Sequence, residues 1–230
     1  LVWNERLSKP RIFQMNHSYW GPNYDSEAIA RIIDEAETEL ASQGCNVRNI
    51  ADEKILCRET AIAISEGKVI GWFQGRMEWG PRALGNRSIL GDPRRSDMKE
   101  ILNLKIKKRE SFRPFAPSIL RSEVSEWFEI DVDVPFMLQV LQIKPEKRKE
   151  IPAVTHVNGS GRLQTVEEDQ NPRYHRLIKS FKELTQVPIL LNTSFNENEP
   201  VVCSPGQALN CFLRTNMDVL VLGNYFISRI

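Results

Sequence analysis

Short apolar runs, bounded by glycine or proline and interleaved with amphipathic stretches, constrain the fold of this chain more than any other feature. The runs predict β-strands at 68–73, 115–120, 136–143, 162–166, 188–192 and 218–222. The amphipathic stretches predict helices at 25–44, 52–67, 97–106, 172–184 and 205–212. Because strands and helices intermix without strict alternation, we predict an α/β fold with a twisted mixed sheet and flanking helices.

The segment 75–95 interrupts this pattern with a high density of Gly, Pro and Arg and is predicted to be a loop. It carries Arg82 and Arg87 among glycines, which allow the backbone to approach a ligand closely. The forked donors of a guanidinium match the geometry of phosphate and carboxylate groups. A solvated surface loop is the alternative, but the arginine density beside a buried strand favours an anion site.

Two further clusters place cations at the ends of predicted elements. Lys107 and Arg109 follow a predicted helix and precede an apolar strand, so both can point at a polyphosphate. A solvated basic helix end is the alternative, since cations there also interact favourably with the helix dipole. The Gly-rich turn at 158–161 delivers Arg162 and Gln164 onto a strand, where an ordinary hairpin is the alternative.

A fourth cluster begins where the predicted strand 188–192 ends. The run Asn192-Thr193-Ser194-Phe195-Asn196 replaces apolar residues with small polar and amide side chains. Ligands of open α/β sheets collect at the carboxyl ends of strands. These polar side chains are therefore predicted to face a ligand, with a capped strand end as the alternative reading.

Composition limits the classes of function. The chain has 31 Lys and Arg against 30 Asp and Glu, a net charge of +1, so binding to nucleic acid through bulk charge is not expected. The four cysteines form no CxxC pair and the three histidines are scattered, so no metal site is predicted in this chain. Reduced thiols in a cytoplasmic protein are expected, and no apolar run approaches membrane-spanning length.

Four motifs together resemble the C-terminal region of the O-carbamoyltransferases, which include the nodulation-factor, cephamycin and tobramycin carbamoyltransferases. They are Gly-Pro-Arg-Ala-Leu-Gly-Asn-Arg-Ser, Lys-x-Arg-Glu-x-Phe-Arg-Pro-Phe-Ala-Pro, Gly-Arg-x-Gln-Thr-Val and Asn-Thr-Ser-Phe-Asn, beginning at residues 80, 107, 161 and 192. The resemblance covers about 52–230. It implies a fold similar to that of threonylcarbamoyladenylate synthase, whose Lys-x-Arg and Ser-x-Asn signatures match residues 107–109 and 194–196.

The resemblance implies ATP-dependent activation of carbamoyl phosphate to carbamoyl adenylate, within an enzyme that carbamoylates a hydroxyl of a small-molecule or sugar-like acceptor. The residues expected to act on the reacting groups are Lys107, Arg162 and Ser194. Those expected to bind the nucleotide are Arg82, Arg87, Arg109, Asn192 and Asn196. Mg²⁺ would bridge the phosphates. An RNA- or nucleotide-binding module of the same fold without catalysis is the alternative.

The same resemblance suggests a division of the chain. Residues 51–230 would form the carbamoyltransferase C-terminal domain. Residues 1–50 would form a connector and the trailing edge of an N-terminal domain of the actin-like ATPase class, most of which is missing from this chain. The iron-binding histidines and the acceptor site would belong to that missing domain, so carbamoyl transfer is expected to need it.

Overall fold

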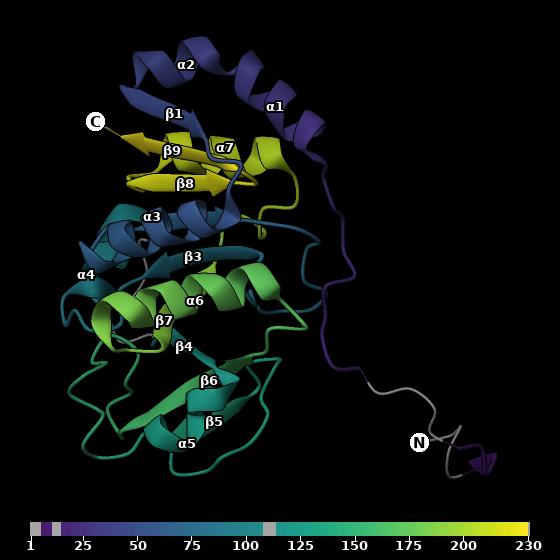
Figure 1. The fold of residues 1–230 in the computed structure, drawn as a ribbon, viewed down its shortest axis with the longest axis vertical. Helices are drawn as coiled ribbons and strands as arrows, with labels where there is room; N and C mark the ends of the chain where they lie inside the picture. The colour runs from purple at the N-terminus through teal and green to yellow at the C-terminus, as the bar shows by residue number, and fades with distance from the viewer. Residues whose placement is uncertain (1–5, 11–14, 108–113, 230) are drawn as a thin grey trace.

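A nine-stranded mixed sheet forms the framework of the computed structural model, which describes residues 6–10, 15–107 and 114–229 (Figure 1). The strand order within the described residues is β1-β9-β8-β2-β3-β7-β4-β6-β5. Pairs β2–β8 and β4–β6 are parallel and the others are antiparallel. The strands are β1 Cys45–Asn49, β2 Ile70–Phe73, β3 Arg87–Gly91, β4 Ala116–Leu120, β5 Gln139–Gln142, β6 Ser160–Val166, β7 Ile189–Ser194, β8 Val219–Leu222 and β9 Tyr225–Arg229. The predicted mixed α/β architecture is confirmed.

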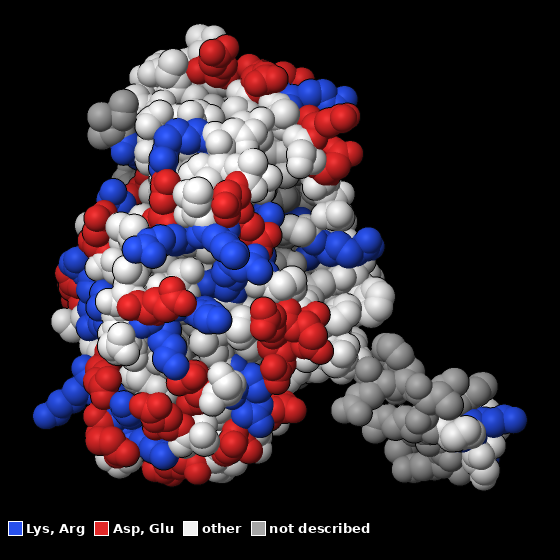
Figure 2. Space-filling model, in the orientation of Figure 1, with Lys and Arg blue, Asp and Glu red and all other residues white. Residues whose placement is uncertain are grey.

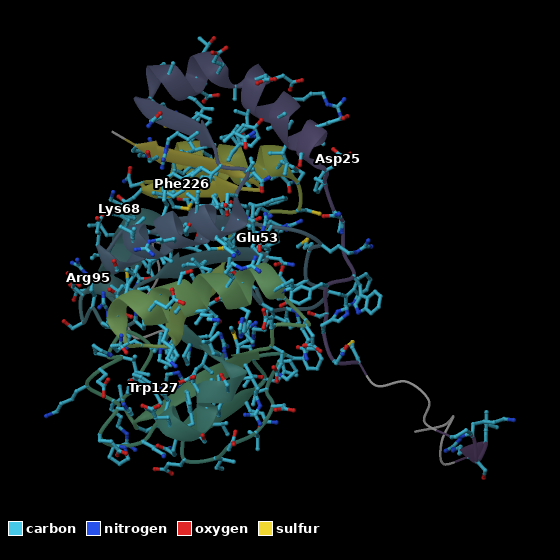
Figure 3. All side chains as sticks on the ribbon, viewed as in Figure 1. Asp25, Glu53, Lys68, Arg95, Trp127 and Phe226 are labelled. Atoms are coloured by element: carbon cyan, nitrogen blue, oxygen red, sulfur yellow. The ribbon has the colours of Figure 1, made fainter. Side chains whose placement is uncertain are left out.

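Helices flank both faces of this sheet. The helices are α1 Ser26–Glu35, α2 Glu37–Ser42, α3 Glu53–Ser65, α4 Met98–Leu102, α5 Val124–Trp127, α6 Pro172–Thr185 and α7 Pro205–Arg214, with a 3-10 turn at Arg121–Glu123. Helices α3 and α6 pack together in front of the sheet in Figure 1, whereas α7 lies behind β8 and β9. Asp25, at the start of α1 (Figure 3), caps this helix by accepting a hydrogen bond from the Ala28 amide.

The predicted loop at 75–95 is wrong in its second half, because β3 lies within it. Strand β3 is fully buried between β2 and β7, near the middle of the sheet. The predicted helix at 25–44 is also divided, into α1 and α2 with a break at Ala36. The edge strand β1 and its neighbour β9 were not predicted. Strand β1 lies within the range expected to be a connector, yet it pairs with the sheet.

The predicted helix at 97–106 changes its winding halfway. Helix α4 ends at Leu102 and continues as a π-helical turn over Asn103–Lys107. Such turns are rare and occur frequently at functional sites. Here the turn brings the Lys107 ammonium to the end of β7.

Charged side chains are interspersed on the face of the molecule shown in Figure 2, where basic residues gather across the middle and acidic residues lie above and below them. Among the described residues, no helix is both long enough and apolar enough to cross a bilayer.

Candidate functional site

A cleft of about 310 Å³ opens beside the end of β7. Four residues singled out from the sequence line it, namely Arg82, Arg162, Asn192 and Ser194. The other described residues that line it are Pro81, Ala83, Pro114, Phe115, Ala116, Met137 and Thr193. The first, third and fourth sequence clusters therefore converge on one cavity.

The strand register brings these side chains together. Asn192 of β7 pairs with Ala116 of β4, and Ser118 of β4 pairs with Gln164 of β6. Directly opposed residues share a face of a sheet, as do residues two apart along a strand. Asn192, Ser118, Gln164 and Arg162 consequently point to the same side.

Arg82 faces the cleft with most of its hydrogen-bonding capacity unused. Its Nη1 donates to the Pro81 carbonyl at 3.2 Å, while its Nε is buried and has no hydrogen-bond partner among the described residues. Arg162 is half-buried on β6 and lines the same cleft. Two guanidinium groups in a cavity of this size can bind a phosphate group in a bidentate manner.

Lys107 and the Ser-x-Asn run meet, as the shared signature suggests, but the ammonium contacts the protein itself. Lys107 Nζ donates to the carbonyls of Ser194 and Asn196 at 2.6 and 2.7 Å and to Asn196 Oδ1 at 2.7 Å. The Ser194 hydroxyl donates to the same Oδ1 at 2.8 Å. Lys107 is only 4% exposed. These bonds fix the turn that presents Ser194 to the cleft.

The side-chain amide of Asn192 belongs to a buried polar network. The two hydrogens of its Nδ2 are shared among three acceptors, the Ala83 carbonyl at 3.2 Å, Ser118 Oγ at 3.1 Å and Gln164 Oε1 at 3.0 Å. Sequence reasoning placed Gln164 on a strand without giving it a role. It missed Ser118, because a lone serine inside the apolar run 115–120 gives no signal of function.

Arg87 occupies a different place from the one predicted. Its guanidinium is fully buried and donates to the backbone carbonyls of Gln74, Asn86, Gly75 and Pro22 at 2.6–3.3 Å. It also lies 3.6 Å from the centre of the Phe73 ring. Burial lowers its pKa to about 10, opposed by the nearby Glu78 carboxylate. Arg87 therefore holds the loop together and does not line the cleft.

Glu78 completes the internal structure of this loop. Its Oε1 accepts hydrogen bonds from the backbone amides of Leu84 and Asn86 at 2.7 Å and of Arg87 at 3.1 Å. The Glu78 carboxylate is buried, where water does not reach the three backbone amides, so the carboxylate serves as their hydrogen-bond acceptor. The loop is thus shaped by its own charged residues.

Arg109, the last predicted nucleotide-binding residue, lies outside the described residues, as does Lys108. Asn196, which was also predicted to bind the nucleotide, does not line the cleft. Its Nδ2 donates to the Glu199 carbonyl at 2.6 Å, so it stabilises the turn after β7. Among the described residues, no group of three or more His, Cys, Asp or Glu is arranged to hold a metal ion.

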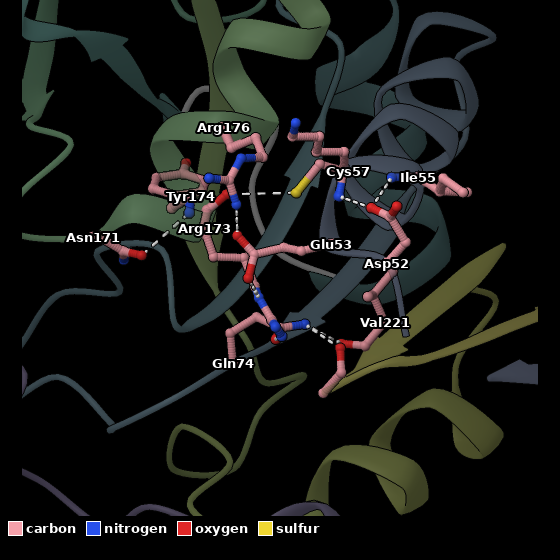
Figure 4. Close-up of polar contacts among 12 residues, drawn as sticks. Asp52, Glu53, Ile55, Cys57, Gln74, Asn171, Arg173, Tyr174, Arg176 and Val221 are labelled. Carbon is pink, nitrogen blue, oxygen red and sulfur yellow. Dashed lines mark hydrogen bonds and ion pairs between the residues drawn. The ribbon is translucent and has the colours of Figure 1, made fainter. Parts of the chain in front are cut away.

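A second cluster of arginines joins α3 to α6 (Figure 4). Glu53 of α3 accepts a hydrogen bond from Arg173 Nε at 3.0 Å and pairs with Arg176. Arg173 Nη1 donates to Gln74 Oε1 at 2.7 Å. Burial lowers the pKa of Arg173. One carboxylate and one amide thus engage these cations, and the cluster links two helices rather than lining the cleft.

Comparison with known proteins agrees with the sequence motifs. The family model described as "Carbamoyltransferase C-terminus" matches residues 61–229. Nodulation protein NolNO of Sinorhizobium fredii is 44% identical over 220 residues, covering 94% of this chain and 31% of that protein. The 3'-hydroxymethylcephem-O-carbamoyltransferase of Amycolatopsis lactamdurans is 41% identical over 140 residues, covering 61% of this chain and 26% of that enzyme. The chain spans less than half the length of the curated relatives that match nearly all of it.

Among solved structures, full-length HypF, crystallised in a phosphate- and nucleotide-bound form, matches with a TM-score of 0.50 and 18% sequence identity. The match covers 77% of this chain and 22% of HypF. At this level of identity the likeness concerns the fold.

Proposed function

The chain belongs to the carbamoyltransferase C-terminal family, and from this premise we propose that its cleft converts carbamoyl phosphate and ATP to carbamoyl adenylate. The observation that carries the proposal is the convergence of Arg82 and Arg162 with Asn192 and Ser194 in one cavity. The cleft combines cations, which suit the phosphate of carbamoyl phosphate, with neutral polar groups, which suit its amide.

The reaction needs charge stabilisation more than a protein nucleophile. Carbamoyl phosphate loses its phosphate to water, and a carbamate oxygen then attacks the α-phosphorus of ATP, which releases pyrophosphate. Negative charge develops on the phosphoryl oxygens and on the departing pyrophosphate. Fixed guanidinium groups stabilise this charge without reorganisation, which assigns that role to Arg82 and Arg162.

Lys107 and Ser194 act as a pair in this proposal. The ammonium holds the turn after β7 through two carbonyls and one side-chain oxygen. This arrangement keeps the Ser194 hydroxyl at the rim of the cleft, within reach of a phosphoryl or carbamoyl oxygen. Lys107 therefore contributes positive charge close to the site and positions the serine.

Two features bear on the nucleotide and its metal. HypF, part of which has a similar fold, was crystallised in a phosphate- and nucleotide-bound form, and this supports nucleotide use in the proposal. The lining of the cleft within the described residues contains no carboxylate. Mg²⁺ would therefore be held mainly by the phosphate oxygens of the nucleotide, whose charge it would partly neutralise.

Transfer of the carbamoyl group to a hydroxyl is proposed to involve the remainder of a longer polypeptide. The relatives exceed this chain more than twofold in length, since it covers 31–40% of the first three. The acceptor site, any iron and the actin-like ATPase-type domain would belong to that remainder. Residues 1–50 would connect the two parts.

The decisive test is ATP–pyrophosphate exchange that depends on carbamoyl phosphate. We expect exchange with the full chain, and Arg162→Ala should reduce it about 30- to 1000-fold, which corresponds to roughly 2–4 kcal/mol of transition-state stabilisation. Arg121→Ala is the matched control, because that guanidinium is paired with Asp131 and Asp133 on the surface. Exchange that ignores carbamoyl phosphate, or an Arg162→Ala variant as active as the control, would contradict the proposal.

A further inference from the structure

A buried hydrogen-bond acceptor in the cleft lacks a donor. Asn192 lines the cleft and is 1% exposed, and its Oδ1 has no hydrogen-bond partner within the part of the chain that the structure describes. Leaving a buried acceptor unsatisfied is unfavourable, and native proteins seldom do so without a reason. The other end of the same amide is saturated, so the side chain is satisfied on one side only.

Hydrogen bonds that begin at a backbone carbonyl fix the orientation of the Asn192 side-chain amide. The Leu84 carbonyl can only accept, and it receives a hydrogen bond from Gln164 Nε2 at 2.8 Å. Gln164 must therefore present its Oε1 to the sheet, where that oxygen accepts from Ser118 Oγ at 2.6 Å and from Asn192 Nδ2 at 3.0 Å. A backbone carbonyl thus sets the direction of the whole network.

A second carbonyl confirms the direction at Asn192. Its Nδ2 also donates to the Ala83 carbonyl at 3.2 Å, so a reversed amide would set its oxygen against two other oxygens. The oxygen and nitrogen of an amide lie on opposite sides of its carbon. With Nδ2 turned toward Gln164 and Ser118, Oδ1 is turned away from them and keeps its capacity to accept a hydrogen bond.

We propose that Asn192 Oδ1 accepts an N–H from the carbamoyl group, and that Gln164 is the residue that positions it for this role. The inference rests on the proposed function and adds substrate selectivity to it. In carbamoyl phosphate only the NH₂ group can donate, whereas the phosphate end can be bound by Arg82 and Arg162 in the same cleft. Both ends of the substrate then have a partner of matching chemistry.

This assignment makes the cleft selective against acyl phosphates that lack an N–H. Acetyl phosphate has nearly the same shape, with a methyl group in place of the NH₂. A site built to hydrogen-bond its substrate discriminates against such an analogue, because the buried polar group is left unpaired. For one neutral hydrogen bond we expect discrimination of about 10- to 100-fold.

The test compares the KM for carbamoyl phosphate with the inhibition constant of acetyl phosphate, both measured by ATP–pyrophosphate exchange with the full chain. In the wild type the inhibition constant should exceed KM by about 10- to 100-fold. In Asn192→Ala the two constants should converge, because KM rises while the affinity for acetyl phosphate is retained. Gln164→Leu should reduce the ratio in the same direction but by less, since it removes one of the three acceptors that orient the Asn192 amide.

Gln74→Leu provides the matched control. Gln74 is also a buried glutamine, and its Nε2 donates to the Gly223 carbonyl at 3.1 Å, away from the cleft. Gln74→Leu should lower the stability of the protein and leave the ratio of the two constants unchanged. If Gln164 had only a structural role, Gln164→Leu would behave in the same way as this control. If Asn192→Ala does not fold by circular dichroism, Gln164→Leu alone decides the matter.

The outcomes separate the two proposals. Carbamoyl-phosphate-dependent exchange in the wild type, together with a ratio that falls in both variants, supports the selectivity assignment. The same wild-type exchange with an unchanged ratio in the variants overturns the assignment and leaves the proposed function standing. A wild type without carbamoyl-phosphate-dependent exchange overturns both.

Discussion

Arg82 and Arg87 lie in the same glycine-rich segment and yet belong to two different kinds of site. Arg87 donates through Nη1 and Nη2 to four backbone carbonyls and lies over a phenyl ring, so the terminal nitrogens of its guanidinium are engaged by the protein itself. Arg82 has one hydrogen bond within the described residues, to its neighbour Pro81, and lines the cleft. A count of arginines therefore overstates the number of ligand contacts, because part of the charge serves to build the loop.

The difference between the two arginines also explains how the loop keeps its shape. Arg87 and Glu78 bind backbone carbonyls and amides on the inner side of the loop. Buried hydrogen-bond networks of this kind restrain the groups that they join. A restrained inner side allows Arg82 to remain at the cleft with the Pro81 carbonyl as its one hydrogen-bond partner among the described residues, which is the preorganisation that binding an anion requires.

The largest expected effect tests the inner side. Arg87→Met removes a buried cation that donates to four backbone carbonyls, and it should lower the free energy of unfolding by about 3–5 kcal/mol. Denaturant unfolding, followed by circular dichroism, measures this change. A loss below about 1 kcal/mol would mean that Arg87 is not required for the loop, and the contrast with Arg82 would disappear.

The converse substitution tests the cleft side. Arg82→Met should change the free energy of unfolding by less than about 1 kcal/mol, because the guanidinium makes a single contact within the described residues. Carbamoyl-phosphate-dependent exchange should nevertheless fall about 30- to 1000-fold. If Arg82→Met lowered the free energy of unfolding as much as Arg87→Met, both arginines would be needed to hold the loop together.

Ser194→Ala should have a smaller effect than either arginine variant. It removes one neutral hydroxyl from the cleft, which corresponds to about 1–2 kcal/mol, or roughly 5- to 30-fold in exchange rate. Ser42→Ala, at the exposed end of α2, is the control and should leave the rate unchanged. Equal rates for the two variants would remove Ser194 from the reacting part of the cleft.

The smallest expected effect is a pH dependence at His156. Burial, then Lys99 and Arg162, lower the pKa of this imidazole below its ordinary value of 6.5. As pH falls through about 6.5, His156 binds a proton in the unfolded chain before it does so in the folded protein. Stability is therefore lost as pH falls below that value. Thermal unfolding of His156→Gln across pH 5–7 should show a weaker acid loss than the wild type; identical curves would contradict this assignment.

Much of the fold could be predicted, because most strands are apolar runs and most helices carry an apolar stripe. Strand β3 was missed because its buried residues include Arg87 and Ser88, so its composition resembles that of the loop before it. Strands β1 and β9 are short and half-exposed near one edge of the sheet, where a pattern of burial is weak. Polar residues that are buried by tertiary pairing give no local signal of a strand.

The candidate site divides in a similar way. The motifs indicated that Arg82, Arg162 and Ser194 would converge, and all three line the cleft, while their roles toward a ligand stay a prediction. Residue type could not show that Arg87 would meet four carbonyls or that Lys107 would bind the turn after β7. Those contacts depend on which backbone groups the folded chain leaves unpaired, and that information is absent from any short window of sequence.

The shared face of Arg162 and Asn192 makes activity a measure of correct strand pairing. A slip of one residue along β6 or β7 would send the affected side chain to the opposite face of the sheet, together with its neighbours two positions away. A misregistered molecule would thus have no cleft chemistry at all, rather than a weakened version of it. In a preparation of mixed quality, specific activity would count the natively paired fraction, and the Michaelis constant of the surviving activity would stay that of the native protein.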